Sequence, residues 1–452
     1  MQTVEERKQQ GKAYRKITPR SALGRWKVET GRGLVQDLLL EQEKSRMSEL
    51  IPIRRQRMAA SPFAFFRGTA VLQAHDLFLS PGTDFRVQAC GDAHLANFGI
   101  FASPERRMVF DINDFDETLL APFEVDVKRL AASIEICGRD RGFPKQLREE
   151  AVCGAAAAYQ RAMMEFSDMG NMEVWYRHLD MGSFLEDTSH FSDRAQEKRV
   201  RDAVDRAGSK NSDLAVHKLT EIVDGKLRIK SDPPYIVPIR DMLTEEKALY
   251  DFHAGILRAL ALYKESLPME RRGLIEQYEP LELAHKVVGV GSVGRKAWIL
   301  VLMGRENGDP LVLQIKEAEK SVLEDYYGLS PYPECGRRVV EGQRAIQTAG
   351  DILLGWVRLL RNDGRMSDYH VRQLWDAKGA FDLETISGEG LKGLSVLCAW
   401  TLAHAHAKTG DRHALAGYLG KSDAFENAMA SYAFAYADQN EADYEMFLKM
   451  QK

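Results

Sequence analysis

Residues 88–118, QACGDAHLANFGIFASPERRMVFDINDFDET, concentrate side chains that can bind metal ions and move protons. The segment contains six acidic residues, one histidine and two asparagines between apolar runs. Like charges repel and burying carboxylates is costly, so such a group needs cations or other partners in the folded protein. The candidates for chemistry are Asp92, His94, Asn97, Asp111, Asp114 and Asp116.

A second segment, residues 287–318, combines a glycine cluster with a lysine in an apolar strand: VVGVGSVGRKAWILVLMGRENGDPLVLQIKEA. Glycines let backbone N–H groups approach phosphate oxygens because no Cβ intervenes. A dinucleotide-binding fold needs a helix after the glycines, whereas here two predicted strands follow, which is the arrangement of the protein-kinase glycine-rich loop. The predicted nucleotide-binding residues are Gly289, Gly291, Ser292, Gly294 and Lys316.

Lys316 needs an anionic partner if it faces inward from an apolar sheet. A carboxylate on a following helix would set its position, and RRVVEGQRAIQ places Glu341 on a helical pattern. Glu317 and Glu319 are alternatives, of which Glu317 ranks lower because an adjacent strand residue faces the opposite side. We therefore predict Lys316 and Glu341 as a catalytic pair.

The order of residues in 88–118 matches the needs of kinase-type phosphotransfer. That reaction uses an Asp at the acceptor hydroxyl, an Asn on a metal ion a few residues later, and an Asp after a short strand on the same metal. Asp92 is the predicted catalytic residue, and Asn97 is a predicted metal ligand. Asp111 directly follows the strand and is favoured by its spacing from Asn97, whereas Asp114 precedes Phe115 in an Asp-Phe pair, so both are candidate metal ligands.

GDAHLANFG resembles the HGDxHxxN catalytic loop of aminoglycoside and choline phosphotransferases, and VFDINDFDE resembles their metal-binding segment. The resemblance implies a structural role for Asp126. Two departures suggest altered metal use or lost transfer: Cys90 stands where that pattern has His, and acids at 114, 116 and 117 exceed the usual motif. The motif order is also reversed, because the catalytic loop precedes the glycine loop, which indicates a circularly permuted kinase-like fold.

The chain as a whole resembles an uncharacterised bacterial family, domain of unknown function 2252. The phrases that carry this resemblance span roughly residues 55–440 and are SPFAFFRG, CGDAHLANFG, FDINDFDET, KVVGVGSVG, LQIKEA, VVEGQR and AGYLG. Membership implies kinase-like ancestry and no established substrate.

The helices and strands expected from the sequence must bring these residues together. They predict an α+β fold of the two-lobed protein-kinase type, with a small antiparallel-sheet lobe and a large helical lobe. We expect an N-terminal extension (1–57), a helical lobe with the catalytic and metal loop (58–284), a β-rich nucleotide-binding lobe (285–375) and C-terminal helices that complete the helical lobe (376–452). The helical region 150–285 is the least kinase-like part and a candidate surface for substrate or partner.

Composition excludes several classes of protein. The 452 residues carry a net charge of −4, which gives no case for binding nucleic acid or an anionic membrane surface. No run approaches the length of a membrane span, and the N-terminus has no apolar core of a secretory signal. Five cysteines without a CxxC pair fit a reducing compartment, so we expect a cytoplasmic protein.

These patterns predict an ATP- and Mg²⁺-dependent phosphotransferase or nucleotidyl transferase that acts on a hydroxyl group of an unknown small-molecule or protein acceptor. One alternative is a non-catalytic, pseudokinase-type nucleotide-binding module. Another is a metal-dependent phosphohydrolase, in which the carboxylates of residues 92–116 bind two metals. The hydrolase leaves the pattern of residues 287–316 unexplained.

Overall fold

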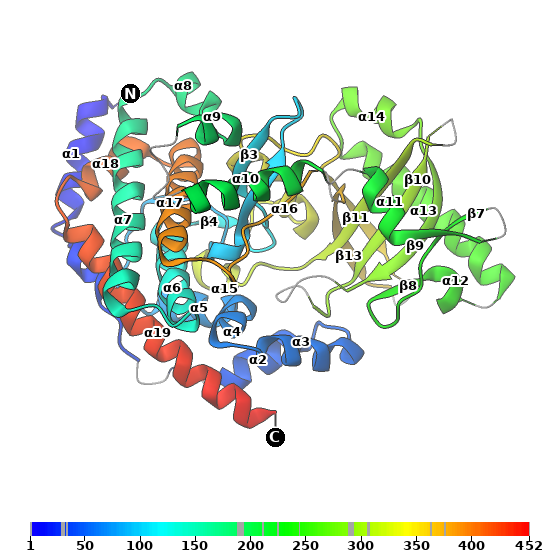
Figure 1. The fold of residues 1–452 in the computed structure, drawn as a ribbon, viewed down its shortest axis with the longest axis horizontal. Coiled ribbons are helices and arrows are strands. Elements are labelled where there is room, and N and C mark those ends of the chain that lie inside the picture. Colours follow the sequence, from blue (N-terminus) through cyan, green and yellow to red (C-terminus); the bar gives the residue numbers. More distant parts are fainter. Residues whose placement is uncertain are drawn as a thin grey trace.

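The computed structural model has a mixed α+β fold in which long helices and a large antiparallel sheet lie side by side (Figure 1). Helices from both ends of the chain lie together on one side, and the large sheet lies on the other. The structure describes residues 2–28, 32, 35–187, 194–209, 212–223, 226–243, 245–287, 293–304, 308–361, 364–374 and 377–451.

The helical side contains the largest hydrophobic core of the described chain. Its helices are α1 (Val4–Tyr14), α4 (Pro62–Gly68), α5 (Ala70–Phe78), α6 (Glu124–Asp140), α7 (Lys145–Asp168), α17 (Gly388–Thr409), α18 (Arg412–Leu419) and α19 (Ala424–Met450). α17 packs along α7, α19 packs on α6 and α7, and α1 packs on α18. Alanines at these contacts allow the close approach of the helices, and aromatic rings such as Tyr159 and Phe425 fill the space between them.

The large sheet joins six strands among the described residues, in the order β12-β13-β11-β10-β9-β8, with every neighbouring pair antiparallel. The strands are β8 (Ile236–Pro238), β9 (Glu279–Lys286), β10 (Ala297–Met303), β11 (Pro310–Ala318), β12 (Gly355–Leu360) and β13 (Met366–Gln373). Side chains alternate between the two faces. Leu311 and Leu313 of β11 pack in one core with α13 (Glu246–Glu265), whereas Val312 packs in another with α11 (Ser212–Leu219).

Short strands lie between the long helices and the large sheet (Figure 1). They are β1 (Arg86–Ala89), β2 (Phe98–Ala102), β3 (Met108–Ile112), β4 (Leu119–Pro122) and β5 (Leu179–Asp180). β1 pairs with β4, and β3 pairs with β2 and β5. The loops that follow β1 and β3 therefore emerge next to each other.

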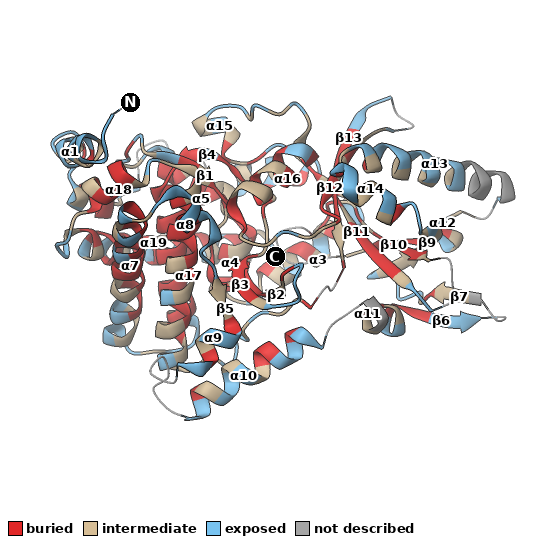
Figure 2. Ribbon diagram, turned by 90° about the horizontal axis from the view of Figure 1, so that it is seen from above, coloured by how far each residue is buried: buried red, intermediate tan, exposed pale blue. Residues whose placement is uncertain are grey.

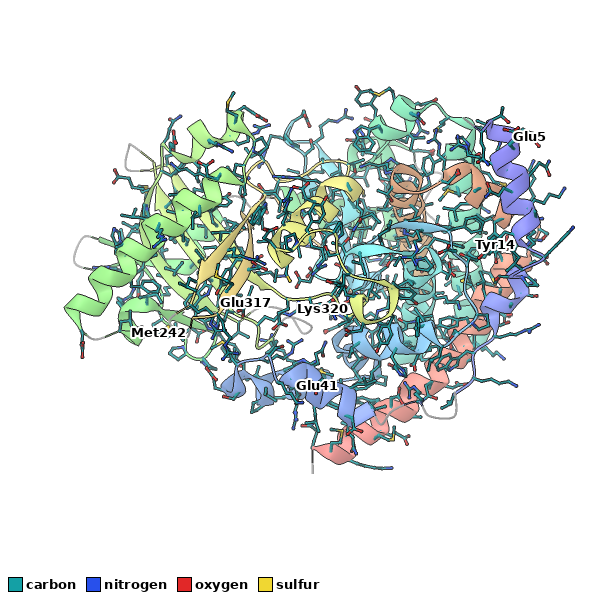
Figure 3. All side chains as sticks on the ribbon, turned by 180° about the vertical axis from the view of Figure 1, so that it is seen from behind. Glu5, Tyr14, Glu41, Met242, Glu317 and Lys320 are labelled. Carbon is teal, nitrogen blue, oxygen red and sulfur yellow. The ribbon has the colours of Figure 1, made fainter. Side chains whose placement is uncertain are left out.

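The remaining elements surround these layers. They are η1 (Arg20–Gly24), α2 (Val35–Glu43), η2 (Ser48–Leu50), α3 (Ile51–Met58), η3 (Leu95–Asn97), α8 (Asn171–Tyr176), α9 (Met181–Glu186), α10 (Arg194–Gly208), β6 (Thr220–Val223), β7 (Lys226–Ile229), α12 (Ile239–Met242), α14 (Met269–Ile275), α15 (Glu324–Tyr327) and α16 (Cys335–Ile346). Figure 2 shows buried residues concentrated in the long helices and the strands of the large sheet, whereas α13 exposes its outer face. In Figure 3, seen from behind, Glu317 marks the end of β11 and Lys320 the segment that leaves the sheet.

The sheet side begins earlier in the chain than the predicted boundary at residue 285. β8 pairs with β9, and α11 and α13 cover the two faces of the same sheet. Described apolar residues of both helices pack in the same clusters as the strand residues, which explains why these helices lie on the sheet side. Among the described residues, no helix combines the length and the apolar composition that a membrane crossing requires.

Candidate functional site

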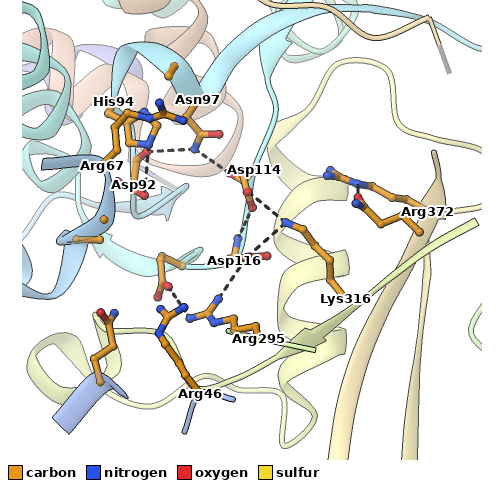
Figure 4. Close-up of a pocket in the computed structure, with 16 residues that line it drawn as sticks. Arg46, Arg67, Asp92, His94, Asn97, Asp114, Asp116, Arg295, Lys316 and Arg372 are labelled. Atoms are coloured by element: carbon orange, nitrogen blue, oxygen red, sulfur yellow. Dashed lines mark hydrogen bonds and ion pairs between the residues drawn. The ribbon is translucent and has the colours of Figure 1, made fainter. Parts of the chain in front are cut away.

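A cavity of about 270 Å³ lies where the large sheet meets the loops that follow β1 and β3 (Figure 4). Six of the candidate residues from the sequence line it, namely Asp92, His94, Asn97, Asp114, Asp116 and Lys316. The cavity is lined mainly by charged and amide side chains, some of which come from elements that the sequence did not connect with the site. The structure thus brings together residues from both chemical segments of the chain.

Asp126 of α6 fixes the backbone of the loop that carries Asp92. The buried Asp126 carboxylate accepts hydrogen bonds from the backbone N–H groups of Cys90 (2.8 Å) and Gly91 (2.9 Å). His406 of α17 contacts the same carboxylate at 3.2 Å and Tyr159 through its other ring nitrogen. Gly91 has φ +83, and a Cβ there would lie 2.1 Å from a backbone oxygen, so glycine is required.

Asp92 itself is fixed by a buried arginine of α6. Arg129 Nε donates to Asp92 Oδ1 at 2.7 Å, and its other nitrogens donate to Gln73 Oε1 and to the Phe66 carbonyl. Burial raises the pKa of Asp92, while Arg129 opposes this shift and Asp114 adds to it. A carboxylate with a raised pKa and a fixed position is suited to accept a proton from a hydroxyl group.

Asn97 ties the two loops together. Its Nδ2 atom donates to the carbonyls of Asp92 and Asp114, each at 3.1 Å. With both amide hydrogens used in this way, its side-chain oxygen is the atom left for other partners. His94 lies beside Asp92, with 3.6 Å between His94 Nε2 and Asp92 Oδ2.

The two candidate aspartates after β3 differ sharply in their surroundings. Asp111 is buried inside the strand and accepts hydrogen bonds from the backbone N–H (2.9 Å) and hydroxyl (2.5 Å) of Thr348. Asp114 follows the strand, lines the cavity and keeps 39% of its side chain exposed. Both residues were candidate metal ligands, with Asp111 favoured by spacing, and the structure places only Asp114 in the lining of the cavity, whereas the side chain of Asp111 contacts Thr348.

Lys316 reaches the cavity from the large sheet. In β11 it pairs with Ala297 of β10 and His370 of β13, so it lies well inside the sheet. Its ammonium is 3.3 Å from Asp114 Oδ2 and 3.6 Å from Asp116 Oδ2. Figure 4 shows it pointing toward these two carboxylates across the cavity.

The additional acids of the segment have cationic partners from the far part of the chain. Arg295, directly after the glycine segment, contacts Asp116 at 3.2 Å and Glu117 at 3.1 Å. Burial opposes ionisation of Asp116, but the charges of Lys316 and Arg295 outweigh it and hold the Asp116 pKa well below its usual range. Glu117 also accepts a hydrogen bond from the Val322 backbone at 2.8 Å. These acids compensate buried cations and fasten the sheet to the loop after β3.

Glu341 does not take the predicted position beside Lys316. It pairs with Arg344 on the same helix, at 3.1 Å, and among the described residues the carboxylates within ion-pair distance of Lys316 are those of Asp114 and Asp116. The nearby loop supplies the ammonium with partners, so the helix is not needed for that purpose. α16 instead sends Arg338 to the backbone carbonyls of that loop, including those at 116 and 118, each at 2.7 Å.

Three predicted nucleotide-binding residues, Gly289, Gly291 and Ser292, lie outside the described residues. Gly294 is described and has φ +89, which favours glycine. Its carbonyl accepts a hydrogen bond from the Met47 N–H at 2.8 Å, and Arg46 donates to the Val293 carbonyl. The segment after α2, which belongs to the predicted N-terminal extension (residues 1–57), therefore contacts the end of the glycine segment.

The oxygen atoms at the cavity fit the expected magnesium ion. Asp114 provides a partly exposed carboxylate and Asn97 an amide oxygen, and magnesium is commonly held by one or two such groups together with waters and substrate phosphates. Among the described residues, no group of three or more His, Cys, Asp or Glu side chains could hold a metal ion, so a magnesium ion here would depend on waters and substrate phosphates for most of its ligands. Asp111 has no part in this donor set.

Sequence reasoning missed several cationic residues of the cavity: Arg46, Arg67, Arg295 and Arg372. The sequence position of Arg295 could have indicated a role at the site, since this arginine directly follows Gly294 of the predicted nucleotide-binding segment. Arg67 stands in an apolar phrase that predicts a buried ion pair, whereas the structure places it at the cavity. Arg46 had no signal, because nothing in its polar surroundings distinguishes a cavity residue from a surface one.

Comparisons with known proteins identify the family alone. No curated protein and no solved structure gives a significant match to the chain. The family described as an uncharacterized protein conserved in bacteria, domain of unknown function 2252, matches residues 46–450. That match begins at Arg46 and includes every residue of the cavity named above. The chain therefore belongs to the family called domain of unknown function 2252.

Proposed function

We propose that this protein is an ATP- and Mg²⁺-dependent phosphotransferase of kinase-like ancestry that acts on a hydroxyl acceptor. The observation that carries the proposal is the meeting of Lys316 with Asp114 in one cavity that also contains Asp92 and Asn97. A phosphate-neutralising lysine, a metal-binding Asp and Asn, and an Asp for the acceptor hydroxyl are the parts that kinase-type transfer requires.

The order of elements on the sheet side supports the same ancestry. A glycine segment, the strand β10, the lysine-bearing strand β11, the helix α16 and two further strands follow one another. A kinase small lobe has the glycine loop, the lysine strand and the following helix in this order. The catalytic segment precedes all of these elements, so the proposal includes a circular permutation.

In the proposed reaction, Lys316 and the glycine segment hold the ATP phosphates, and Asp92 orients the acceptor hydroxyl and takes its proton. The acceptor oxygen forms a bond to the γ-phosphorus while the bond between that phosphorus and the departing ADP oxygen breaks. Asp114 and Asn97 would hold Mg²⁺, which neutralises charge on the phosphates. Arg129 keeps Asp92 in place, and most of the rate gain comes from positioning and charge stabilisation.

Product analysis tests this proposal. The purified protein would be incubated with ATP, Mg²⁺ and pools of hydroxyl compounds, and nucleotide products would be separated. ADP that depends on an acceptor is the expected result, whereas pyrophosphate would indicate nucleotidyl transfer. If the protein binds ATP but forms no nucleotide product that depends on an acceptor, the proposed transferase activity is contradicted.

One observation favours a second candidate, a non-catalytic nucleotide-binding module. Kinase activity requires the lysine to pair with a helix glutamate, and here Glu341 pairs with Arg344. In that case Lys316 would bind nucleotide without turnover, and Asp92→Ala would leave the biological activity unchanged in a folded protein. The metal-dependent phosphohydrolase gains no such support from the described residues.

A further inference from the structure

Arg67, in the last turn of α4, is the cavity cation with the fewest protein partners. Among the described residues it forms no ion pair, and its Nε atom is buried without a hydrogen-bond partner. It lines the cavity beside Asp92 and His94 (Figure 4). Burial lowers the Arg67 pKa, and Asp92 opposes that shift. Arg67 is only partly buried, but its Nε donor is buried and unused, and burying an unpaired donor of a charged group is costly unless an anion compensates it.

Asp92 does not provide that compensation directly. Its Oδ1 atom is hydrogen-bonded to Arg129 at 2.7 Å, so the carboxylate already has a cationic partner. His94 adds no negative charge either. Burial, together with the charges of Arg67 and Arg129, lowers the His94 pKa well below its usual value, and its buried Nδ1 atom has no hydrogen-bond partner within the described residues.

The cations on the sheet side of the cavity differ from Arg67 in this respect. Lys316 contacts Asp114 and Asp116, and Arg295 contacts Asp116 and Glu117. Arg372 donates to Gln314 Oε1 at 3.1 Å and to the Asn113 carbonyl at 3.2 Å. Arg46 and Arg295 also have buried Nε atoms without a hydrogen-bond partner among the described residues, but Arg46 donates to the Val293 carbonyl and Arg295 has the carboxylates named above. Arg67 is therefore the cation with unused donor capacity at the Asp92 corner of the cavity.

We propose that Arg67 binds the anionic group of a small acceptor molecule whose hydroxyl lies at Asp92. This inference rests on the proposed function and specifies its substrate class as an alcohol that carries a carboxylate or a phosphate ester. The planar guanidinium can bind either group through two parallel hydrogen bonds. A neutral alcohol would leave Arg67 unpaired and is thereby disfavoured.

Ligand binding to variants of the full chain tests this inference. The probes are three-carbon compounds that differ in charge, namely glycerol, D-glycerate and glycerol 3-phosphate, and the readout is the shift in thermal unfolding midpoint and the Kd from titration calorimetry. At least one of the two anions is expected to stabilise the wild-type protein more than glycerol does, and the stronger of the two identifies the preferred group. Arg67→Gln is expected to weaken its binding by about ten-fold or more, because charge-assisted hydrogen bonds are lost.

The controls separate this inference from the proposed function. Arg67→Lys retains the charge and should keep part of the response, and Arg25→Gln, at an exposed arginine, should respond like the wild type. ATP with Mg²⁺ should bind Arg67→Gln as it binds the wild type, and the anion should still bind Lys316→Met. Failure of the wild type to bind ATP would contradict the proposed function and leave the Arg67-dependent anion response standing.

Three results would overturn the inference while ATP binding stands. The first is that glycerol stabilises the protein as well as both anions do. The second is that Arg67→Gln binds the anion as tightly as the wild type. The third is that Arg67→Gln loses ATP binding to the same degree as Lys316→Met, which would assign Arg67 to the nucleotide subsite.

Discussion

The ammonium of Lys316 lies 3.3 Å from a carboxylate oxygen of Asp114, although 202 residues separate them in the chain. The lysine comes from the middle of the large sheet and the aspartate from the loop after β3. A buried lysine and a partly exposed carboxylate that face the same cavity are positioned to share a phosphate group and its metal ion between them.

Replacement of Asp114 and of Asp111 should have opposite consequences. Asp114→Ala should abolish the Mg²⁺ dependence of ATP binding and change the free energy of unfolding by no more than about 1 kcal/mol, because the carboxylate is partly solvated. Asp111→Ala should destabilise the protein by about 2–3 kcal/mol, because Thr348 loses the acceptor of two hydrogen bonds. Urea unfolding and ATP titration with and without Mg²⁺ measure both effects. Loss of Mg²⁺ dependence in a stable Asp111→Ala would reverse the assignment.

Asp92→Asn should remove transfer and leave nucleotide binding intact. The amide oxygen can still accept the hydrogen bond from Arg129, so the fold should be retained. Without a group that takes the acceptor proton, the rate should fall by about 10²–10⁴-fold. Acceptor-dependent ADP formation measures the rate, and Asp84→Asn, at a carboxylate with 74% of its side chain exposed, is the matched control. Unchanged turnover in Asp92→Asn would exclude this role.

Arg46 should affect the nucleotide site although it lies in the predicted N-terminal extension. Burial, with Arg54 and Arg295 nearby, lowers the pKa of Arg46 to about 9, so an anionic phosphate in the cavity would relieve an uncompensated cation. Arg46→Ala also removes the hydrogen bond to the Val293 carbonyl. We expect a roughly ten-fold weaker Kd for ATP by titration calorimetry. Lys44→Ala, at a side chain that is 71% exposed, should bind ATP normally; equal affinities of the two variants would contradict the contact.

His370 should make the protein sensitive to acid. Burial lowers its pKa from 6.5 to about 3, with Asp116 opposing the shift. Between these two pH values the unfolded state binds a proton that the folded state does not, so stability falls as the pH falls. Relative to pH 7, this group should cost the wild type roughly 2 kcal/mol at about pH 4.5.

Urea unfolding at pH 7 and at about pH 4.5 measures whether the free energy of unfolding falls as the pH falls. His370→Asn should lose that part of the pH dependence, whereas His178→Asn, at an exposed histidine, should retain it. A His370→Asn variant with the same acid sensitivity as the wild type would show that His370 is already protonated in the folded protein.

Local patterns explain which elements could be predicted from the sequence. Residues 246–265 have helical periodicity and form α13, and the apolar and β-branched residues in 297–303 and 310–318 form β10 and β11. Family membership was also predicted and is confirmed over residues 46–450. These features depend on residues that are neighbours in the chain, where periodicity is informative.

The unpredicted parts depend on contacts between distant segments. Nothing local to Asp116 and Glu117 indicates that Arg295 neutralises them from 178–179 residues away. Glu341 has the spacing from Lys316 that a helix partner would have. The ammonium of Lys316 is instead paired with the carboxylate of Asp114 in the loop after β3, and Glu341 pairs with Arg344. Asp111 and Asp114 cannot be separated by spacing, because the choice depends on where β3 ends and which side chain then turns into the cavity.

Titration calorimetry of ATP with Mg²⁺ into the wild type, Lys316→Met and Lys320→Met tests the central claim most directly. Lys320 lies four residues beyond Lys316, is about half exposed, and is the matched control. The account predicts Mg²⁺-dependent binding to the wild type and to Lys320→Met, and a Kd at least about ten-fold weaker for Lys316→Met. Absence of ATP binding to the wild type, or equal affinity in Lys316→Met, would contradict it.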